Sequence, residues 1–127
     1  YDRLRELMGE KIEGVNFGAR AYNSTAFANR RAEMWDNLRQ WFEDPAGVQV
    51  PDSDELQGDL CSIVRGPGAT RFNSSGQLVL EPKEHVKERL TFSPDLGDAA
   101  ALTHAIEISA VQHTDEDDNS SGGWLAA

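Results

Sequence analysis

The chain reads Phe92-Ser93-Pro94-Asp95-Leu96-Gly97-Asp98-Ala99-Ala100-Ala101-Leu102-Thr103 between residues 92 and 103, and this stretch decides how its fold is interpreted. Ser93 can cap a helix, Pro94 suits the first helical position, and Asp95 complements the positive end of the helix dipole. We therefore predict a helix that begins here and packs closely against another element. Its small apolar residues are Ala99, Ala101, Leu102, Ala105 and Ile106.

Asp95 and Asp98 are the first candidates for chemistry. Their spacing of three residues places both carboxylates at neighbouring points of one helix face, pointing out from the N-terminal turn. Two hard oxygen ligands on one rigid element suit Mg²⁺ or Mn²⁺, with water and phosphate completing the coordination. In two-metal phosphoryl chemistry, such acids hold the ions that flank the scissile phosphate. The alternative is that both acids only stabilise the positive end of the helix dipole.

Residues 29–42 show the clearest helical pattern elsewhere in the chain. Residues 44–47, Asp-Pro-Ala-Gly, end this predicted helix. We interpret its apolar stripe as a core face, with Arg and Glu on the opposite side. The stripe contains Met34, Trp35, Leu38, Trp41 and Phe42.

Shorter elements complete a chain of the α/β class. We predict helices at residues 1–8, 55–60 and 84–90, and a strand at residues 11–17. A β-hairpin is predicted from strands at residues 69–72 and 77–81. The turn between them is Asn73-Ser74-Ser75-Gly76, with glycine where a positive φ is expected.

The net charge of −10 is distributed unevenly. No Lys or Arg follows Arg89, whereas seven acids do, so residues 1–89 have a net charge of only −3. An acidic chain argues against sequence-independent DNA binding through a broad basic surface. It does not exclude a metal-dependent nuclease, because cations bound at carboxylates reverse the local charge.

The length of 127 residues allows one modest core or a piece of one. The sequence starts at Tyr1 inside a predicted helix, so we expect a fragment. No apolar run is long enough for a membrane span, and the single Cys61 rules out an internal disulfide. Residues 113–127 form a low-complexity acidic tail that we expect to be disordered.

Four segments resemble, in the same order, motifs from the C-terminal nuclease domain of tailed-phage terminase large subunits. The closing one is Ser93-Pro94-Asp95 followed by Asp98-Ala99 and a small apolar helix. The others are Gly14-Val15-Asn16-Phe17-Gly18, Asn29-Arg30-Arg31-Ala32-Glu33-Met34-Trp35 and Gly76-Gln77-Leu78-Val79-Leu80-Glu81-Pro82-Lys83. Together they cover the chain from its N-terminus to about residue 106.

This resemblance implies a ribonuclease H-like fold, shared with Holliday-junction resolvases. Residues 1–112 would be the C-terminal portion of that nuclease domain, with helices around a mixed sheet that includes a β-hairpin. The parent protein would cut concatemeric double-stranded DNA with two divalent ions, Mg²⁺ or Mn²⁺. The resemblance makes Asp95 and Asp98 candidate catalytic residues and metal ligands, with Asp95 the better match for direct ligation. Lys83 resembles a lysine near the active site that could contact phosphate.

The sequence also departs from the family pattern. Acids that the family carries on two earlier strands have no counterpart in residues 1–20, and no Walker-type motif of an ATPase motor appears. Gly97 stands where the family usually has Ala, and His104 replaces a frequent aromatic residue. We therefore expect this chain alone to be inactive or nearly so.

The resemblance further implies portal protein and the small terminase subunit as partners of the parent protein. It implies no membrane partner, and it places the parent in the cytoplasm of the infected bacterial host. Three alternatives stay open: a non-catalytic docking fragment that binds portal or small subunit, a junction-resolving nuclease of the same fold, and a structural domain whose acids are helix caps.

Overall fold

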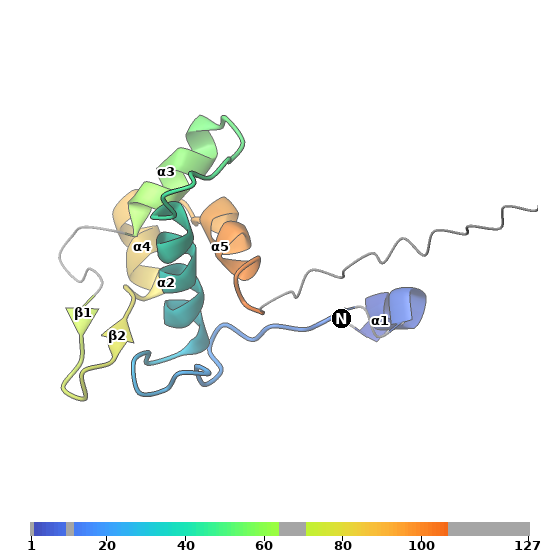
Figure 1. Cartoon of the computed structure of the whole chain (residues 1–127), viewed down its shortest axis with the longest axis horizontal. Helices are drawn as coiled ribbons and strands as arrows, with labels where there is room; N and C mark the ends of the chain where they lie inside the picture. Colours follow the sequence, from blue (N-terminus) through green and yellow to red (C-terminus); the bar gives the residue numbers. More distant parts are fainter. Residues whose placement is uncertain (1, 10–11, 64–70, 107–127) are drawn as a thin grey trace, which may run out of the picture.

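The computed structural model describes residues 2–9, 12–63 and 71–106. Within them, no helix is long and apolar enough to cross a membrane. The expected tail at residues 113–127 lies outside the described part of the chain. Figure 1 shows the elements in order: α1 (Asp2–Met8), α2 (Arg30–Phe42), α3 (Asp54–Ser62), β1 (Arg71–Phe72), β2 (Leu78–Val79), α4 (Lys83–Leu90) and α5 (Asp95–Leu102).

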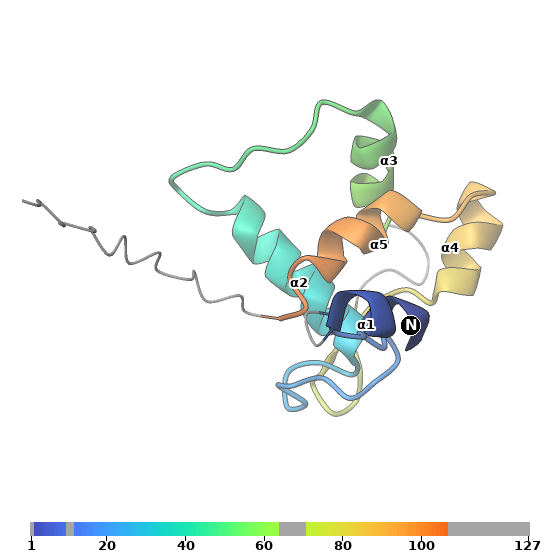
Figure 2. The ribbon, with the colours of Figure 1, turned by 90° about the vertical axis from the view of Figure 1, so that its right-hand side faces the viewer.

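Helix α2 is the centre of the fold. Its predicted extent is confirmed, whereas Phe42 of the predicted core stripe is exposed. It begins where the Asn29 side chain accepts a hydrogen bond from the backbone N–H of Ala32 at 2.9 Å. Helix α5 packs against both α2 and α3 (Figure 2). The buried core between these helices consists of Met34, Trp35, Leu38, Ile63, Ala101 and Ala105.

The charged residues in the first turn of α2 are buried, although the sequence places Arg and Glu on the side opposite the apolar stripe. Arg30, Arg31 and Glu33 are all buried. Arg30 pairs with Glu33 at 2.6 Å, and Glu33 also accepts the backbone N–H groups of Tyr22 and Asn23 at 2.9 and 2.8 Å. Burial acts to raise the pKa of Glu33, but these donors outweigh it and the pKa is lowered. The turn therefore anchors the preceding loop.

The strand predicted at residues 11–17 is wrong. Residues 12–16 have no regular secondary structure, and Lys11 lies outside the described residues. Phe17 instead accepts the backbone N–H of Arg31 at 3.0 Å, while Val15 and Phe17 pack against the core. The partial alternation of apolar residues reflects these core contacts, because the segment pairs with no strand in the described part of the chain.

Strands β1 and β2 form an antiparallel pair around the turn at residues 73–76. Gly76 has a φ of +75°, as the turn chemistry requires. Leu78 of β2 also forms a single parallel bridge with Phe27. Strand β2 is shorter than the predicted range 77–81, since Gln77, Leu80 and Glu81 lie outside it, and residues 69–70 of the other predicted strand lie outside the described residues. The β-structure of the described residues therefore consists of this two-stranded sheet and one isolated bridge. The larger mixed sheet that the resemblance implies is not present in this part of the chain.

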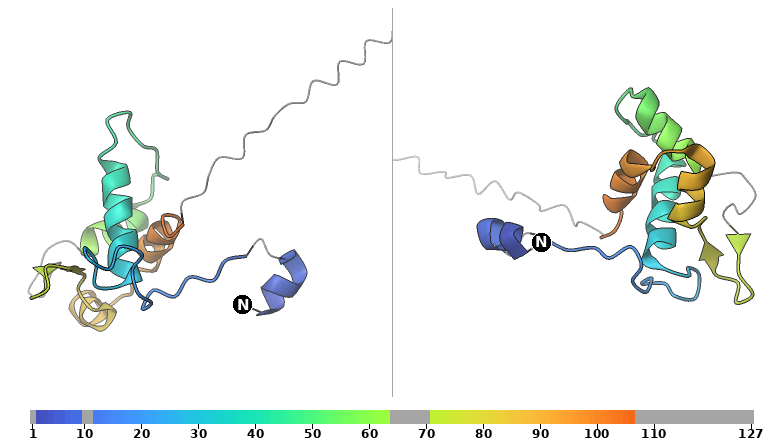
Figure 3. Two further views of the ribbon diagram at one scale, coloured as in Figure 1. Left: turned by 60° about the horizontal axis from the view of Figure 1, so that its bottom comes forward. Right: turned by 180° about the vertical axis from the view of Figure 1, so that it is seen from behind.

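The remaining helices differ from the predictions mainly at their ends. Helix α3 extends the predicted range 55–60 by one residue at its start and two at its end, and α4 begins one residue before the predicted range 84–90. Helix α1 contains no buried residue and stands apart from the other helices (Figure 3).

The start of α5 corrects the predicted capping by Ser93. Pro94 occupies the cap position with a non-helical ψ of 61°, so the helix begins at Asp95. The Ser93 hydroxyl donates to the Asp95 carboxylate at 2.7 Å and is not a cap.

Candidate functional site

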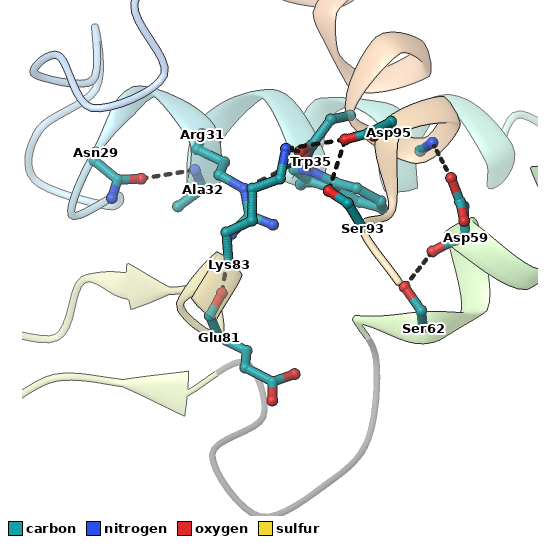
Figure 4. A network of polar contacts seen from close by, with 12 residues as sticks. Asn29, Arg31, Ala32, Trp35, Asp59, Ser62, Glu81, Lys83, Ser93 and Asp95 are labelled. Carbon is teal, nitrogen blue, oxygen red and sulfur yellow. Dashed lines mark hydrogen bonds and ion pairs between the residues drawn. The ribbon is translucent and has the colours of Figure 1, made fainter. Parts of the chain in front are cut away.

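Lys83, Asp95 and Asp98 lie together in the structure. The Lys83 ammonium is 3.2 Å from Oδ1 of Asp95 and 2.9 Å from Oδ2 of Asp98. Lys83 is the first residue of α4, whereas both acids lie in the first turn of α5. Figure 4 shows Lys83 and Ser93 directed toward Asp95. Two helix starts therefore bring together the three residues that the sequence singled out.

Asp98 does not point outward, which corrects the prediction that both carboxylates face solvent. Its side chain is only 6% exposed, compared with 77% for Asp95. Positions three apart differ by about 60° around a helix, which is enough to direct one acid to solvent and the other toward α2. Oδ1 of Asp98 accepts from the indole Nε1 of Trp35 at 3.0 Å and from Nε of Arg31 at 3.4 Å.

Asp95 is an exposed and readily ionised carboxylate. The hydrogen bond from Ser93, followed by the contact with Lys83, holds the pKa of Asp95 below its usual range. The side chain is therefore negatively charged at neutral pH and open to solvent on one side. These are the properties required of a carboxylate that ligates a hard cation.

Lys83 provides the positive charge between the two acids. The contact with Asp98 acts first to raise the pKa of Lys83, against the opposing effect of burial, and Asp95 adds to the rise. A cation at the first residue of a helix is unfavourably placed relative to the dipole of that helix. The two carboxylates offset this repulsion and keep the ammonium between them.

A second layer of contacts holds these residues in place. The guanidinium of Arg31 donates to the backbone carbonyl of Glu81 at 2.9 Å, just before α4 begins. The Glu81 side chain is 1% exposed and pairs with Arg89 at 2.6 Å. Arg89 also donates to the carbonyl of Ser62 at 2.7 Å, which ties α4 to the end of α3. The hydrogen bond from Arg89 holds the pKa of Glu81 below its usual range.

Sequence reasoning missed the residues that position this site. The sequence marks Arg31 only as part of a motif and Trp35 only as part of a core stripe, although both donate hydrogen bonds to Asp98. Asp59 of α3 is 3% exposed and accepts two backbone N–H groups at the start of α5, yet it carries no sequence signal beyond being an acid in a short helix. Gly97 fits closely against Trp35, which only the tertiary packing could reveal.

Three segments that resemble terminase motifs meet at this site. The segment at residues 29–35 supplies Arg31 and Trp35, residues 76–83 supply Glu81 and Lys83, and residues 92–103 supply the acids. The fourth segment, residues 14–18, contacts Arg31 through the carbonyl of Phe17. The sequence motifs are therefore neighbours in space.

The two acids differ in what they can offer to a cation. Asp95 can offer an exposed oxygen, whereas Oδ1 of Asp98 is already engaged and Oδ2 is buried, with an ion pair to Lys83 and no hydrogen bond. No group of three or more His, Cys, Asp or Glu side chains in the described residues is arranged to hold a metal ion. Mg²⁺ or Mn²⁺ bound here would need water, substrate or further acids to complete its coordination.

Comparisons with known proteins give the following matches. No protein-family model and no curated protein matches the chain. Its structure is similar to the nuclease domain of the large terminase subunit gp2 of bacterial virus Sf6, with 20% identity, a TM-score of 0.46, and coverage of 76% of this chain and 50% of that one. A lysine-to-alanine variant of the same subunit from bacteriophage Sf6, with calcium, gives 19% identity and a TM-score of 0.47 over 74% of this chain and 49% of that one. The corresponding variant with manganese also gives 19% and 0.47, over 75% and 51%. The chain thus spans about half the length of the matched chains.

Proposed function

We propose that this chain is the C-terminal portion of a ribonuclease H-like terminase nuclease domain, in which Asp95 and Asp98 form one side of a divalent-metal site. The observation that carries the proposal is the convergence of three motif-like segments on the Lys83, Asp95 and Asp98 cluster. Helix-dipole stabilisation alone would explain an acid at the start of α5. It would not explain why the Asp98 carboxylate turns inward to contact Arg31, Trp35 and Lys83.

The proposed roles follow from exposure and charge. Mg²⁺ or Mn²⁺, when bound, would polarise the scissile phosphate and lower the pKa of a bound water. Asp95 is the direct ligand, since its carboxylate is exposed. Asp98 acts mainly by holding Lys83 and α5 in place, because Arg31 and Trp35 already occupy one of its oxygens. Lys83 has an ammonium that can turn from the carboxylates to a phosphate oxygen of DNA.

The rest of the catalytic site belongs to residues outside this cluster. Two carboxylates are fewer than two-metal chemistry requires, and the matched nuclease chains are about twice as long as the matched region. The proposal therefore assigns cleavage of concatemeric double-stranded DNA to the parent protein. Binding of portal protein and small terminase subunit, and location in the cytoplasm of the infected bacterial host, belong to the same proposal.

Paramagnetic broadening by Mn²⁺ would test the location of the site. We expect substoichiometric Mn²⁺ to broaden the backbone NMR signals of Lys83, Asp95 and Asp98 first. The first-turn acids of α3, Asp54 and Glu55, are a matched control, because they also lie at the positive end of a helix dipole. Equal broadening at α3 and α5 would mean that any helix-start acids attract the ion, and would contradict the proposal.

A further inference from the structure

The start of α5 is held by a residue of another helix. Pro94 at the cap position has no side-chain acceptor for the free N–H groups of the first turn. Asp59 of α3 supplies that acceptor, because its Oδ2 receives the N–H of Leu96 at 2.8 Å and the N–H of Gly97 at 3.1 Å. Figure 4 shows the Asp59 side chain reaching from α3 to this turn. One buried carboxylate oxygen thus caps a helix that lies 37 residues further along the chain.

Gly97 makes this contact possible by allowing α5 to approach both neighbouring helices. A Cβ atom at residue 97 would lie 2.8 Å from Cη2 of Trp35 and 3.3 Å from Cβ of Asp59. Trp35, which covers Gly97 on one side, also donates its indole N–H to Asp98. The same close approach therefore sets both the cap from Asp59 and the hydrogen bond that orients Asp98.

Two hydrogen bonds to successive N–H groups restrict both the position and the rotation of a helical turn. The turn capped by Asp59 is the one that carries Asp95 and Asp98. The negative charge of Asp59 adds a favourable interaction with the helix dipole. Asp59 is not itself suited to ligate a metal at this site, because it is only 3% exposed and its Oδ2 already accepts the N–H groups of Leu96 and Gly97.

We propose that Asp59 is a positioning residue, whose carboxylate fixes the first turn of α5 and thereby the orientation of Asp95 and Asp98 toward Lys83. Where it concerns metal binding, the proposal rests on the function proposed above. The effect of Asp59 on the orientation of Asp98 can be tested without a metal. The Trp35 indole N–H, which donates to Asp98, reports that orientation whether or not a metal binds.

The test compares three variants of the 127-residue chain. Asp59→Ala removes the acceptor, whereas Asp59→Asn keeps an oxygen that can accept the same two N–H groups. Ser53→Ala is the control for the loss of a cap as such, because the Ser53 hydroxyl caps α3 by accepting the N–H of Leu56 at 3.2 Å, away from the acid pair. Each variant is measured by Mn²⁺ titration calorimetry and by the indole N–H signal of Trp35 in a ¹⁵N-correlated NMR spectrum.

We expect Asp59→Ala to weaken Mn²⁺ binding by about tenfold, as the loss of an outer-shell partner does at metal sites, and to shift the Trp35 indole signal. Asp59→Asn should restore both, and Ser53→Ala should change neither. Wild-type affinity together with an unshifted indole in Asp59→Ala would overturn the proposal. A weakening equal in Asp59→Ala and Ser53→Ala would also overturn it, because cap loss in general would then be the cause.

Two further outcomes remain decisive. If the wild-type chain binds no Mn²⁺, the metal-site proposal fails, and the indole signal alone decides whether Asp59 orients Asp98. If Asp59→Ala does not fold, Gly97→Ala replaces it, since the added methyl group pushes α5 away from Trp35 and Asp59 while leaving the Asp59 carboxylate in place. An unshifted indole in a folded Gly97→Ala chain would overturn the proposal.

Discussion

Asp98 and Asp95 show how two acids three residues apart in one helix acquire different roles. Asp98 contacts Arg31, Trp35 and Lys83 and is almost fully buried, whereas Asp95 keeps most of its surface in water. Removal of one partner from a buried ion pair is costly, because the other charge stays behind without compensation. An exposed acid carries no such penalty.

The pair Asp98→Asn and Asp95→Asn tests this difference. We expect Asp98→Asn to lower the free energy of unfolding by about 3 kcal/mol, the lower end for a broken buried pair, because Arg31 keeps its bond to the Glu81 carbonyl. Asp95→Asn should lower the free energy of unfolding much less, because its ion pair with Lys83 is exposed to solvent. Urea unfolding followed by tryptophan fluorescence measures both. Equal stability of the two variants would show that Asp98 is not held as described.

Gly97 offers a second test at the scale of one residue. Ala in place of a helical Gly normally stabilises by up to about 1 kcal/mol. At residue 97 the new Cβ would lie 2.8 Å from Trp35, and such overpacking costs about 1–3 kcal/mol. We therefore expect Gly97→Ala to be destabilising overall. Gly58→Ala in α3 is the matched control, because no atom lies within 4 Å of the added Cβ, and it should be stabilising. Thermal unfolding of both variants gives the sign of each change in stability relative to the wild-type chain. A Gly97→Ala chain that is more stable than wild type would contradict the close packing of α5.

Helix α4 is held by the ion pair between the buried Glu81 and the partly exposed Arg89, and by the hydrogen bond from Arg89 to the Ser62 carbonyl at the end of α3. The pKa of Glu81 is lowered mainly by Arg89. A group whose pKa is depressed in the folded state stabilises the fold above its ordinary pKa, and this contribution is lost as the pH falls. The ordinary value for a glutamate is about 4.3.

We expect the free energy of unfolding to fall as the pH drops from about 5 toward 3, as protons bind more readily to the unfolded chain. Glu81→Gln should reduce this pH dependence without abolishing it, since the pKa values of Glu33 and Asp95 are also lowered. Glu55→Gln, at an exposed position of α3, is the control and should keep the wild-type slope. Urea titrations at several pH values give the slopes, and equal slopes for Glu81→Gln and wild type would contradict the assigned pairing.

The sequence was most informative about elements with local signals. Helix α2 has strong apolar periodicity, so its position could be predicted closely. The prediction of a strand at residues 11–17 is wrong because apolar residues that reach a core from an irregular loop can mimic alternation. Ser93 was mistaken for a cap because the true acceptor, Asp59, is distant in sequence.

Sequence reasoning about the site had the same limit. Asp95, Asp98 and Lys83 could be named from motifs, and the structure places them within ion-pair distance. Their role as metal ligands or phosphate contacts stays a prediction. The burial of Asp98 and the contributions of Arg31, Trp35 and Asp59 depend on how three helices pack, which neither periodicity nor spacing encodes.

The whole chain carries a net charge of −10, and none of its Lys or Arg residues follows Arg89. Phosphate backbones would be repelled by such a chain unless cations are bound at its carboxylates. The charge distribution therefore agrees with the proposal that the cluster of Lys83, Asp95 and Asp98 requires bound metal ions and additional residues before it acts on DNA.

We expect the 127-residue chain to leave supercoiled plasmid uncut in Mg²⁺ or Mn²⁺, because it supplies only one side of the proposed site. Agarose-gel electrophoresis after prolonged incubation measures this, with Asp95→Asn as the control for contaminating nuclease. Divalent-dependent cleavage that Asp95→Asn abolishes would show that the chain already holds a complete active site.

The central claim is that Asp95 ligates a divalent ion, and calorimetric titration of Mn²⁺ into the wild-type chain and into Asp95→Asn at matched ionic strength tests it most directly. The account predicts saturable binding to the wild-type chain that the substitution removes. Absent binding, or equal binding in both chains, would contradict it and leave Asp95 as an acid that only stabilises the start of α5.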